Sequence, residues 1–457
     1  MTGQPASDPF RLPRLSRAKT RPREAGARWS QLLAQFAFAA LVILAIGNPW
    51  MTEQPDERLK LIREVGYIAI FLLTALAMRP WRHPERLLVV PWPLLLALGW
   101  CWLSLLWAVD PGAGLRRLAL TTIVVWSLFA LVRELGLERS ITILQGAFGL
   151  LLVVNYAVVL AYPELGVQAN EALAMKGYWR GVMEQKNFAG FACAITVLLF
   201  AFDTGRIPVA VRIGVCLAAT VFLVLTQSAT SMGVGVAALI VGGLLAWRAK
   251  VAGDRRLAAP GWSWVPFGVM AAICIGMAID PTPYFELVSD PAGFTGRNQI
   301  WTALIRAYAD QPLFGVGYGS LWDLGPNGPI TAYARGWVTE MSQGHNGYLD
   351  LLVQIGAPGT LLVLFATMTW PIQRLLRGGS HPARILGAAM LVFCLGHNFT
   401  ESTLFDRDAL GQVFLMIAIA LLWNATAMAV HAPADAAASA SRRRRSDARR
   451  ARSQPAE

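Results

Sequence analysis

Charged residues and cysteines are both scarce in this chain of 457 residues. Only 15% of the residues are charged and 55% are hydrophobic, which gives a mean hydropathy of +0.47 and excludes an ordinary soluble globule. The five cysteines are odd in number and all fall within apolar runs. They provide no disulfide framework, and the sequence shows no metal-ligand spacing, so we expect no metal and no cofactor.

The first thirty residues lack the apolar stretch of a cleaved signal peptide, because they are polar and rich in proline. We therefore expect the first apolar helix to act as an uncleaved anchor. The sequence also contains no internal repeat and no segment with the composition of a separate soluble domain.

Long apolar runs are abundant instead. A helix needs about 17 to 25 mostly apolar residues to cross the hydrocarbon core of a bilayer. Twelve such runs predict helices, at 31–49, 64–79, 88–108, 118–133, 141–162, 187–203, 208–226, 232–248, 262–280, 346–370, 384–399 and 409–430. The chain then divides into a basic tail (1–30), nine helices (31–280), a large polar insert (281–345), three helices (346–430) and a second basic tail (431–457).

Basic residues predict the orientation of these helices. The chain contains 40 Lys and Arg residues, and its two tails hold fourteen of them. With an even number of helices, five loops lie on the same side as the tails, and these loops hold another fourteen. Since cytoplasmic loops are enriched in Lys and Arg, both tails are expected in the cytoplasm. The arginines at 442–452 lack interleaved aromatic residues, which disfavours nucleic acid and favours a disordered tail beside anionic lipid.

This topology places the polar insert on the outer side of the membrane. Within it, 298–310 is predicted to form an amphipathic helix that lies in the membrane interface, with Leu304 and Tyr308 on its apolar face. The insert has too few apolar residues to bury a core of its own. Its glycine-rich stretch, 312–319, lacks the spacing of a dinucleotide site and predicts a flexible turn back toward the membrane.

His345 directly precedes the apolar run 346–370. A neutral imidazole there could accept a proton from a hydroxyl group, and the positive end of the helix dipole favours that neutral form. The alternative is an interfacial histidine that caps the helix together with Asn346. Arg180 and Arg297 also lie in outer loops, and a guanidinium group matches two phosphate oxygens at once. Either arginine alone also fits a lipid headgroup contact or a salt bridge.

Other polar residues have two interpretations each. Lys186 and Asn187 begin an apolar run, where lysine either extends toward lipid headgroups or contacts a diphosphate. Ser228, Thr230 and Ser231 form a short outer turn that local hydroxyl-to-backbone hydrogen bonds explain.

The order of these motifs resembles the O-antigen ligase and polymerase superfamily. The motifs are Glu184-Gln185-Lys186-Asn187 at a helix start, Ser228-Ala229-Thr230, Arg297 with Trp301 four residues later, Pro312-Leu313-Phe314-Gly315-Val316-Gly317, His345-Asn346-Gly347-Tyr348-Leu349, and Glu401-Ser402. Within the superfamily the sequence looks most similar to exopolysaccharide polymerases of the ExoQ type. The resemblance implies an all-α polytopic protein of the bacterial inner membrane, with about twelve transmembrane helices and a large periplasmic loop containing short helices.

Members of this superfamily transfer a glycan from an undecaprenyl diphosphate donor to a glycan or lipid A core acceptor at the periplasmic face. By resemblance, the expected catalytic residues are Arg180 and Arg297, which hold the diphosphate, and His345, which positions or deprotonates the acceptor hydroxyl. The expected substrate-binding residues are Lys186, Asn187, Trp301, Asn346 and Glu401. No metal or cofactor is implied, because the lipid diphosphate is itself the leaving group. Membrane lipid and polysaccharide export or flippase components are the other expected partners.

Three alternatives stay open from the sequence. Polymerases and ligases share these motifs, so the chain also fits a ligase that attaches glycan to lipid A core. Twelve helices with both tails inside also suit a secondary transporter, although most charged candidates lie at loop edges rather than at the bilayer midplane. A scaffold in a polysaccharide export complex is the third.

Overall fold

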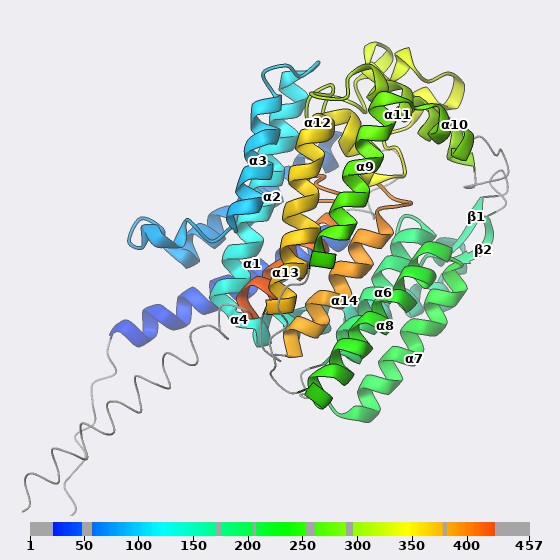
Figure 1. Cartoon of the computed structure of the whole chain (residues 1–457). Helices are drawn as coiled ribbons and strands as arrows, with labels where there is room; N and C mark the ends of the chain where they lie inside the picture. Colours follow the sequence, from blue (N-terminus) through cyan, green and yellow to red (C-terminus); the bar gives the residue numbers. More distant parts are fainter. Residues whose placement is uncertain are drawn as a thin grey trace, which may run out of the picture.

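The chain folds into a bundle of long helices, and the polar insert covers one end of it (Figure 1). The computed structural model describes residues 22–47, 57–170, 175–203, 207–252, 261–288, 296–377 and 382–425. Its long helices are α1 (Pro22–Gly47), α2 (Glu57–Met78), α3 (Trp92–Ser104), α4 (Pro111–Ala161), α6 (Lys186–Ala201), α7 (Val209–Thr226), α8 (Ala229–Ala252), α9 (Val265–Ile279), α12 (Gly347–Leu364), α14 (Pro382–His397) and a last helix, Leu410–Ala425. A π-helical turn, η9 (Phe365–Thr369), joins α12 to α13 (Trp370–Arg377).

Each of the twelve apolar runs overlaps one of these helices. Two of the runs, 118–133 and 141–162, share α4, which breaks at Gly136, where φ is 74°. Glycine adopts this left-handed conformation easily because it has no Cβ. By length and composition, however, only six described helices could cross a membrane, or up to seven if the bent pair of α9 and α10 (Thr282–Val288) is one span. The expected twelve crossings are therefore not confirmed, since α3 and α6 have only 13 and 16 residues.

The outward face of α8 is apolar. Val236, Ile240, Leu244 and Trp247 recur at helical spacing, and more than half of each side chain is exposed. Such a stripe is unfavourable in water, but lipid chains cover it in a bilayer. Figure 1 shows α6, α7 and α8 side by side at one flank of the bundle, and α8 packs on its inner side against α14. These features agree with a multi-pass membrane protein.

The insert packs into a hydrophobic core that it shares with α9 and α12, which agrees with the expectation that it does not bury a core of its own. Its longest helix is α11 (Asn298–Asp310), over the residues predicted from the sequence. Leu304 and Tyr308 on that helix are almost completely buried, together with Leu352 of α12 and Cys274 of α9. The prediction of a helix at 298–310 is confirmed, but its apolar stripe packs against protein rather than membrane lipid. Residues of α9 and α12 provide the other side of this core.

Short turns make up the rest of the insert. They are η6 (Gly325–Asn327), η7 (Pro329–Ala332) and η8 (Gly336–Glu340). The glycine-rich stretch before them, which was expected to be a flexible turn, packs closely against α12. Gly315 has a φ of 64°, and a Cβ on it would lie 2.4 Å from the carbonyl oxygen of Val353. The Val316 amide donates to that same carbonyl at 2.9 Å, so glycine is needed for a close approach of the turn to α12.

A small antiparallel hairpin precedes α6 and was not predicted. It follows the short helix α5 (Pro163–Gly166) and consists of β1 (Val167–Asn170) and β2 (Met175–Trp179). The fold class is otherwise helical, as expected. Most of the two basic tails, residues 1–21 and 426–457, lies outside the described residues, so their cytoplasmic placement stays a prediction.

Candidate active site

Glu401 joins three residues that the sequence singled out separately. Its Oε1 atom accepts a hydrogen bond from Nδ2 of Asn187 at 2.8 Å and lies 3.1 Å from Nη2 of Arg297. Its Oε2 atom lies 3.3 Å from Nδ1 of His345. We refer to Glu401, Asn187, Arg297 and His345 as the Glu401 cluster. Both carboxylate oxygens contact protein groups, so Glu401 organises the other three.

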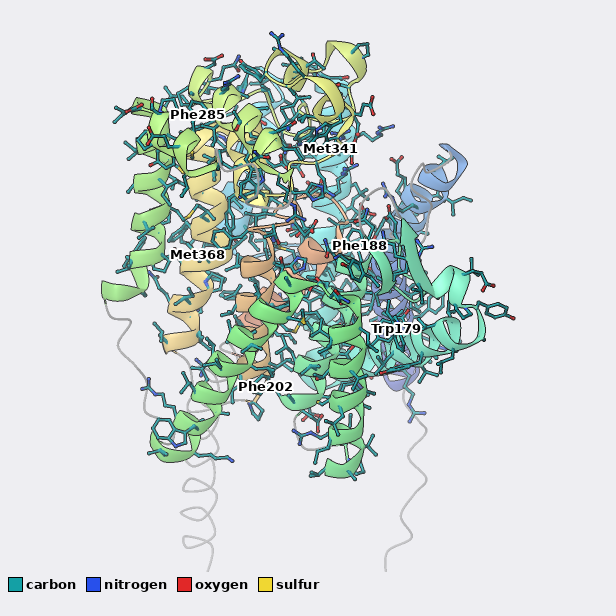
Figure 2. The ribbon with its side chains drawn as sticks, turned by 90° about the vertical axis from the view of Figure 1, so that its right-hand side faces the viewer. Trp179, Phe188, Phe202, Phe285, Met341 and Met368 are labelled. Carbon is teal, nitrogen blue, oxygen red and sulfur yellow. The ribbon has the colours of Figure 1, made fainter. Side chains whose placement is uncertain are left out.

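Four segments supply the Glu401 cluster, and they meet where the insert covers the helices. Asn187 lies in the first turn of α6, and Arg297 is the N-cap of α11. His345 directly precedes the N-cap of α12, and Glu401 lies in the loop after α14. Figure 2 shows Phe188, the neighbour of Asn187, at the end of α6 nearer the insert, whereas Phe202 lies at the opposite end. Phe285 and Met341, also labelled there, belong to the insert itself.

The backbone around His345 is held tightly on both sides. His345 has a φ of 49°, a strained left-handed conformation for a residue other than glycine. On one side, the indole nitrogen of Trp301 donates to the Gly344 carbonyl at 3.0 Å. On the other side, the Asn346 amide donates to the Ser402 hydroxyl at 3.0 Å. These contacts fix the position of the His345 side chain relative to Glu401.

Two residues expected to bind substrate have structural roles in this arrangement. The Asn346 side chain accepts hydrogen bonds from the amides of Tyr348 and Leu349, so it caps α12. Trp301 is only 6% exposed and lies in the core of the insert. Each therefore acts on the site by holding His345 in place.

Glu401 remains ionised at neutral pH. Burial alone would raise its pKa, but the hydrogen bond from His345 and the charges of His345, Arg297 and His397 lower it below its ordinary value. An ionised carboxylate next to Nδ1 favours the histidine tautomer that carries its proton there. That tautomer leaves Nε2 as a proton acceptor.

Positive charge exceeds negative charge around the Glu401 cluster. Lys186 precedes Asn187 and lies close enough to Arg297 for the two positive charges to repel each other. Its ammonium group sits 4.0 Å from the ring centre of Tyr178, which favours a cation over the aromatic face. Lys186 therefore adds a positive charge beside the paired Arg297 and Glu401, and an anionic ligand would complete the charge balance.

A comparison with protein families agrees with this arrangement. A family model described as O-antigen ligase matches residues 214–364. This part of the chain is similar to the O-antigen ligase family. The matched residues run from α7 through α12 and include Arg297, Trp301, His345 and Asn346. No curated protein sequence matches the chain at a significant level, and the expected closeness to ExoQ-type polymerases is not confirmed.

Arg180 lies outside the O-antigen ligase match and outside the Glu401 cluster. Its Nε donates to the Leu165 carbonyl at 3.0 Å, and its Nη1 donates to the Glu184 carbonyl at 2.9 Å. These bonds tie the end of β2 to the loop that leads into α6. The structure therefore shows Arg180 shaping the segment that carries Lys186 and Asn187.

The short serine and threonine turn contacts the Glu401 cluster through Asn187. Ser228 Oγ lies within hydrogen-bond distance of Oδ1 of Asn187 at 3.3 Å and of Ser231 Oγ at 2.9 Å. Ser231 Oγ in turn lies 3.2 Å from Nε2 of the buried His397. The turn was expected to bond mainly to its own backbone, but it connects α8 to α6 and α14.

Across the described residues, no group of three His, Cys, Asp or Glu side chains could hold a metal ion.

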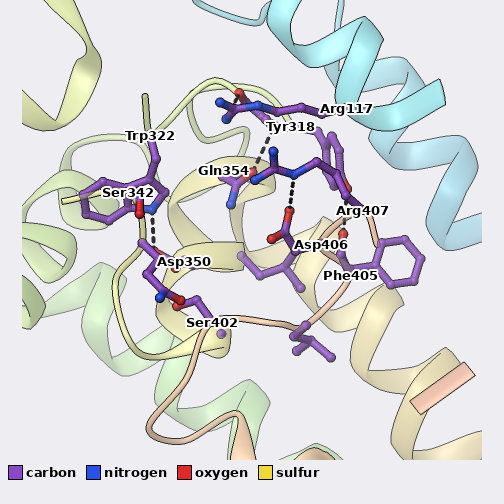
Figure 3. Close-up of a pocket in the computed structure, with 15 residues that line it drawn as sticks. Arg117, Tyr318, Trp322, Ser342, Asp350, Gln354, Ser402, Phe405, Asp406 and Arg407 are labelled. Atoms are coloured by element: carbon purple, nitrogen blue, oxygen red, sulfur yellow. Dashed lines mark hydrogen bonds and ion pairs between the residues drawn. The ribbon is translucent and has the colours of Figure 1, made fainter. Parts of the chain in front are cut away.

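Sequence reasoning missed a second polar region of this fold. A pocket of about 40 Å³ lies next to the Glu401 cluster, and we name it the Arg407 pocket (Figure 3). Its side chains include Arg117, Trp322, Gln354, Ser402, Asp406 and Arg407. Asp350 also lines it, is buried, and accepts from Trp322 Nε1 and the Gly344 amide, both at 2.9 Å. One sequence signal for this region existed, since an acidic residue inside an apolar run marks a functional site by default.

Proposed function

We propose that the chain is a membrane glycosyltransferase that polymerises oligosaccharide repeats carried on undecaprenyl diphosphate, at the periplasmic face of the bacterial inner membrane. The observation that supports this function best is the shared carboxylate of Glu401. It contacts both a guanidinium group suited to a diphosphate and an imidazole suited to a hydroxyl. Groups suited to the donor diphosphate and to the acceptor hydroxyl therefore lie side by side.

Arg297 and Lys186 are the proposed donor site. Transfer breaks the bond between the anomeric carbon and the diphosphate oxygen, and the bonding electrons stay on that oxygen. Preorganised positive groups stabilise this developing charge, and no metal is required for that effect. Monodentate contact with Glu401 leaves other N–H groups of Arg297 to face a phosphate. Arg180 is proposed to act here through the loop that carries Lys186.

His345 is the proposed base. The acceptor hydroxyl attacks the anomeric carbon, and its proton moves to Nε2 of His345, while Nδ1 stays hydrogen-bonded to Glu401. Proton transfer by a positioned histidine accelerates such steps by about 10²–10⁴-fold. Attack from the face opposite the diphosphate predicts inversion at the anomeric carbon. An anomeric assignment that shows retention would rule out this single displacement.

Attachment of glycan to lipid A core is the second candidate, because the matching family model carries the description O-antigen ligase. Donor chemistry is the same in both reactions, so the Glu401 cluster serves either one. The two differ only in the acceptor. The location is proposed from the loop charges: twelve crossings with cytoplasmic tails place the Glu401 cluster on the periplasmic side.

The deciding experiment is the glycan profile of cells that make His345→Ala or Arg297→Ala protein at normal membrane levels. Two exposed residues of the insert supply matched controls, Glu340→Gln and Arg335→Ala. If lipid-linked single repeats accumulate and long polymer disappears, the chain is a polymerase. If polymer persists but its attachment to lipid A core is lost, the chain is a ligase. An unchanged profile in both site variants would refute a catalytic role for the Glu401 cluster.

A further inference from the structure

The Arg407 pocket has features that the proposed donor chemistry does not use. Its walls come from the start of α4, the glycine-rich turn, α12 and the loop 402–407. Its mouth reaches the surface at Ser342, which is exposed, and at Asp406, whose side chain is 41% exposed. The inner volume of about 40 Å³ has room for about three water molecules. That space suits one edge of a sugar ring rather than a whole sugar.

We infer that the Arg407 pocket is the acceptor subsite, where the hydroxyl-bearing edge of the acceptor saccharide binds. This inference rests on the proposed function, because an acceptor is needed only if the chain transfers a glycan. It adds a location and a ligand chemistry for the second substrate.

Charge balance distinguishes this pocket from the donor site, where Lys186 adds a positive charge beside the paired Arg297 and Glu401. Arg407 Nε lies 3.0 Å from Asp406 Oδ1, and Arg117 Nη2 lies 3.4 Å from Asp323 Oδ2. The two guanidinium groups are therefore neutralised within the protein, and a carboxylate faces the mouth. A phosphate would be repelled there, whereas a neutral hydroxyl both donates to a carboxylate and accepts from a guanidinium group.

Hydrogen-bonding capacity remains inside the pocket. Gln354 uses its Oε1 to accept from the Gly319 amide at 2.8 Å, so its NH₂ end is the one left for a ligand (Figure 3). A sugar hydroxyl would accept a hydrogen bond from this NH₂ group.

Backbone strain is concentrated around the same pocket. Phe405 and Arg407, both in its wall, have φ values of 58° and 38°, and His345 nearby has 49°. Left-handed conformations at residues other than glycine are unfavourable and cluster at binding sites and active sites. Here they turn the loop 402–407 so that Asp406 and Arg407 both line the pocket (Figure 3).

Two chain segments connect the pocket to the Glu401 cluster. Ser402 lines the pocket, and its hydroxyl accepts from the amide of Asn346, the residue after His345. Gly347, two residues after His345, lines the pocket as well, and its amide donates to the Glu401 carbonyl at 3.1 Å. A saccharide held in the pocket is therefore next to the segment that carries the proposed base.

The test uses the full-length protein in lipid nanodiscs and measures binding by calorimetry. One saccharide probe is the oligosaccharide repeat that mild acid releases from the lipid-linked intermediates of the strain that carries this gene. The other saccharide probe is lipid A core oligosaccharide. Undecaprenyl diphosphate is the donor-site probe. The variants are Asp406→Asn, which keeps the shape of the side chain, and Gln354→Glu, which keeps the acceptor for Gly319 but removes the NH₂ group.

We expect one of the two saccharides to bind the wild type. Each pocket variant should raise the Kd for that saccharide about tenfold or more. The Kd for undecaprenyl diphosphate should stay unchanged within about twofold. Glu340→Gln, in the same insert, should change neither value. The inference fails if neither saccharide binds the wild type, or if both pocket variants bind the saccharide as tightly as the wild type does. If Asp406→Asn lowers the unfolding temperature, the Kd of Gln354→Glu alone decides whether the inference holds. Failure of the wild type to bind undecaprenyl diphosphate would count against the proposed function instead.

Discussion

Nδ1 of His345 lies 3.3 Å from Oε2 of Glu401, although the two residues are 56 positions apart in the chain. The same carboxylate contacts Arg297 through its other oxygen at 3.1 Å. One buried anion therefore sets the tautomer of the histidine and the position of the arginine. The proposed acceptor and donor sites are coupled through this single side chain.

Removal of either partner should show that coupling. We expect His345→Ala to lower the transfer rate by about 10²–10⁴-fold, because the base is lost. Glu401→Gln should also slow transfer, since the tautomer and the ion pair with Arg297 both change. The double variant should be little worse than His345→Ala alone, because residues that act as a unit are not additive. Rates in proteoliposomes with lipid-linked repeats measure this, and fully additive losses would contradict the coupling.

Arg297→Lys tests whether the guanidinium fork matters beyond its charge. Lysine keeps the positive charge but cannot bind two phosphate oxygens in one plane. We expect the Kd for undecaprenyl diphosphate to rise about tenfold, which corresponds to the loss of one charged hydrogen bond. Arg335→Lys, at an exposed position of the same insert, is the control. Equal affinities of Arg297→Lys and wild type would mean that charge alone suffices.

Trp301→Phe tests the support of His345 from the core of the insert. The change keeps the aromatic ring but removes the donor to the Gly344 carbonyl, and an unsatisfied buried carbonyl costs about 1–3 kcal/mol. We expect a lower unfolding temperature and a reduced transfer rate. Trp337→Phe removes an indole that is 45% exposed and should leave both values near those of the wild type. A normal rate in Trp301→Phe would show that His345 keeps its position without this bond.

Gly315→Ala tests the close packing of the glycine-rich turn on α12. Gly336 has nearly the same φ, 61°, but a Cβ there would meet no atom within 4 Å. Gly336→Ala should therefore cost only the conformational term, about 1–2 kcal/mol. Gly315→Ala should cost about 1–3 kcal/mol more, because its Cβ collides with the Val353 carbonyl. Unfolding measurements on both variants isolate that difference, and equal costs would show that the turn shifts freely.

Acid should weaken the contribution of Glu401 to stability. Its pKa is lower in the folded protein than in the unfolded chain, so ionised Glu401 stabilises the fold at pH values above the ordinary glutamate pKa, about 4.3. That stabilisation is lost as the pH falls through the lower folded value. The gap in unfolding temperature between wild type and Glu401→Gln should stay constant from about pH 7 to pH 5 and then close. A gap that persists at the lowest pH would show that the ionisation of Glu401 does not cause the difference in stability.

Sequence patterns located the helices well, because apolar length is a local property that does not depend on what the helix touches. Every predicted run overlaps a helix, and 298–310 matches the observed bounds of α11. Periodicity could not decide what covers an apolar stripe. The stripe of α11 was expected in lipid and lies instead against α9 and α12, since protein and lipid bury apolar atoms equally well.

Site residues were harder to predict than helices. His345, Arg297, Asn187 and Glu401 were all singled out by the sequence, and the structure brings them together. Arg180 was expected at the same site, but a guanidinium group also binds backbone carbonyls, and here it contacts those of Leu165 and Glu184. Pairing depends on distance in space, which motif spacing does not contain.

The sequence by itself determined that this chain is helical, apolar and divided by one polar insert, because composition and period reflect burial residue by residue. It also determined which side chains are capable of the chemistry. Only the tertiary structure decided that Glu401 links His345 to Arg297 and that Asp406 and Arg407 pair beside them. The contacts of Glu401 with Arg297 and His345 join residues 104 and 56 positions apart, and they exist only once the helices have packed.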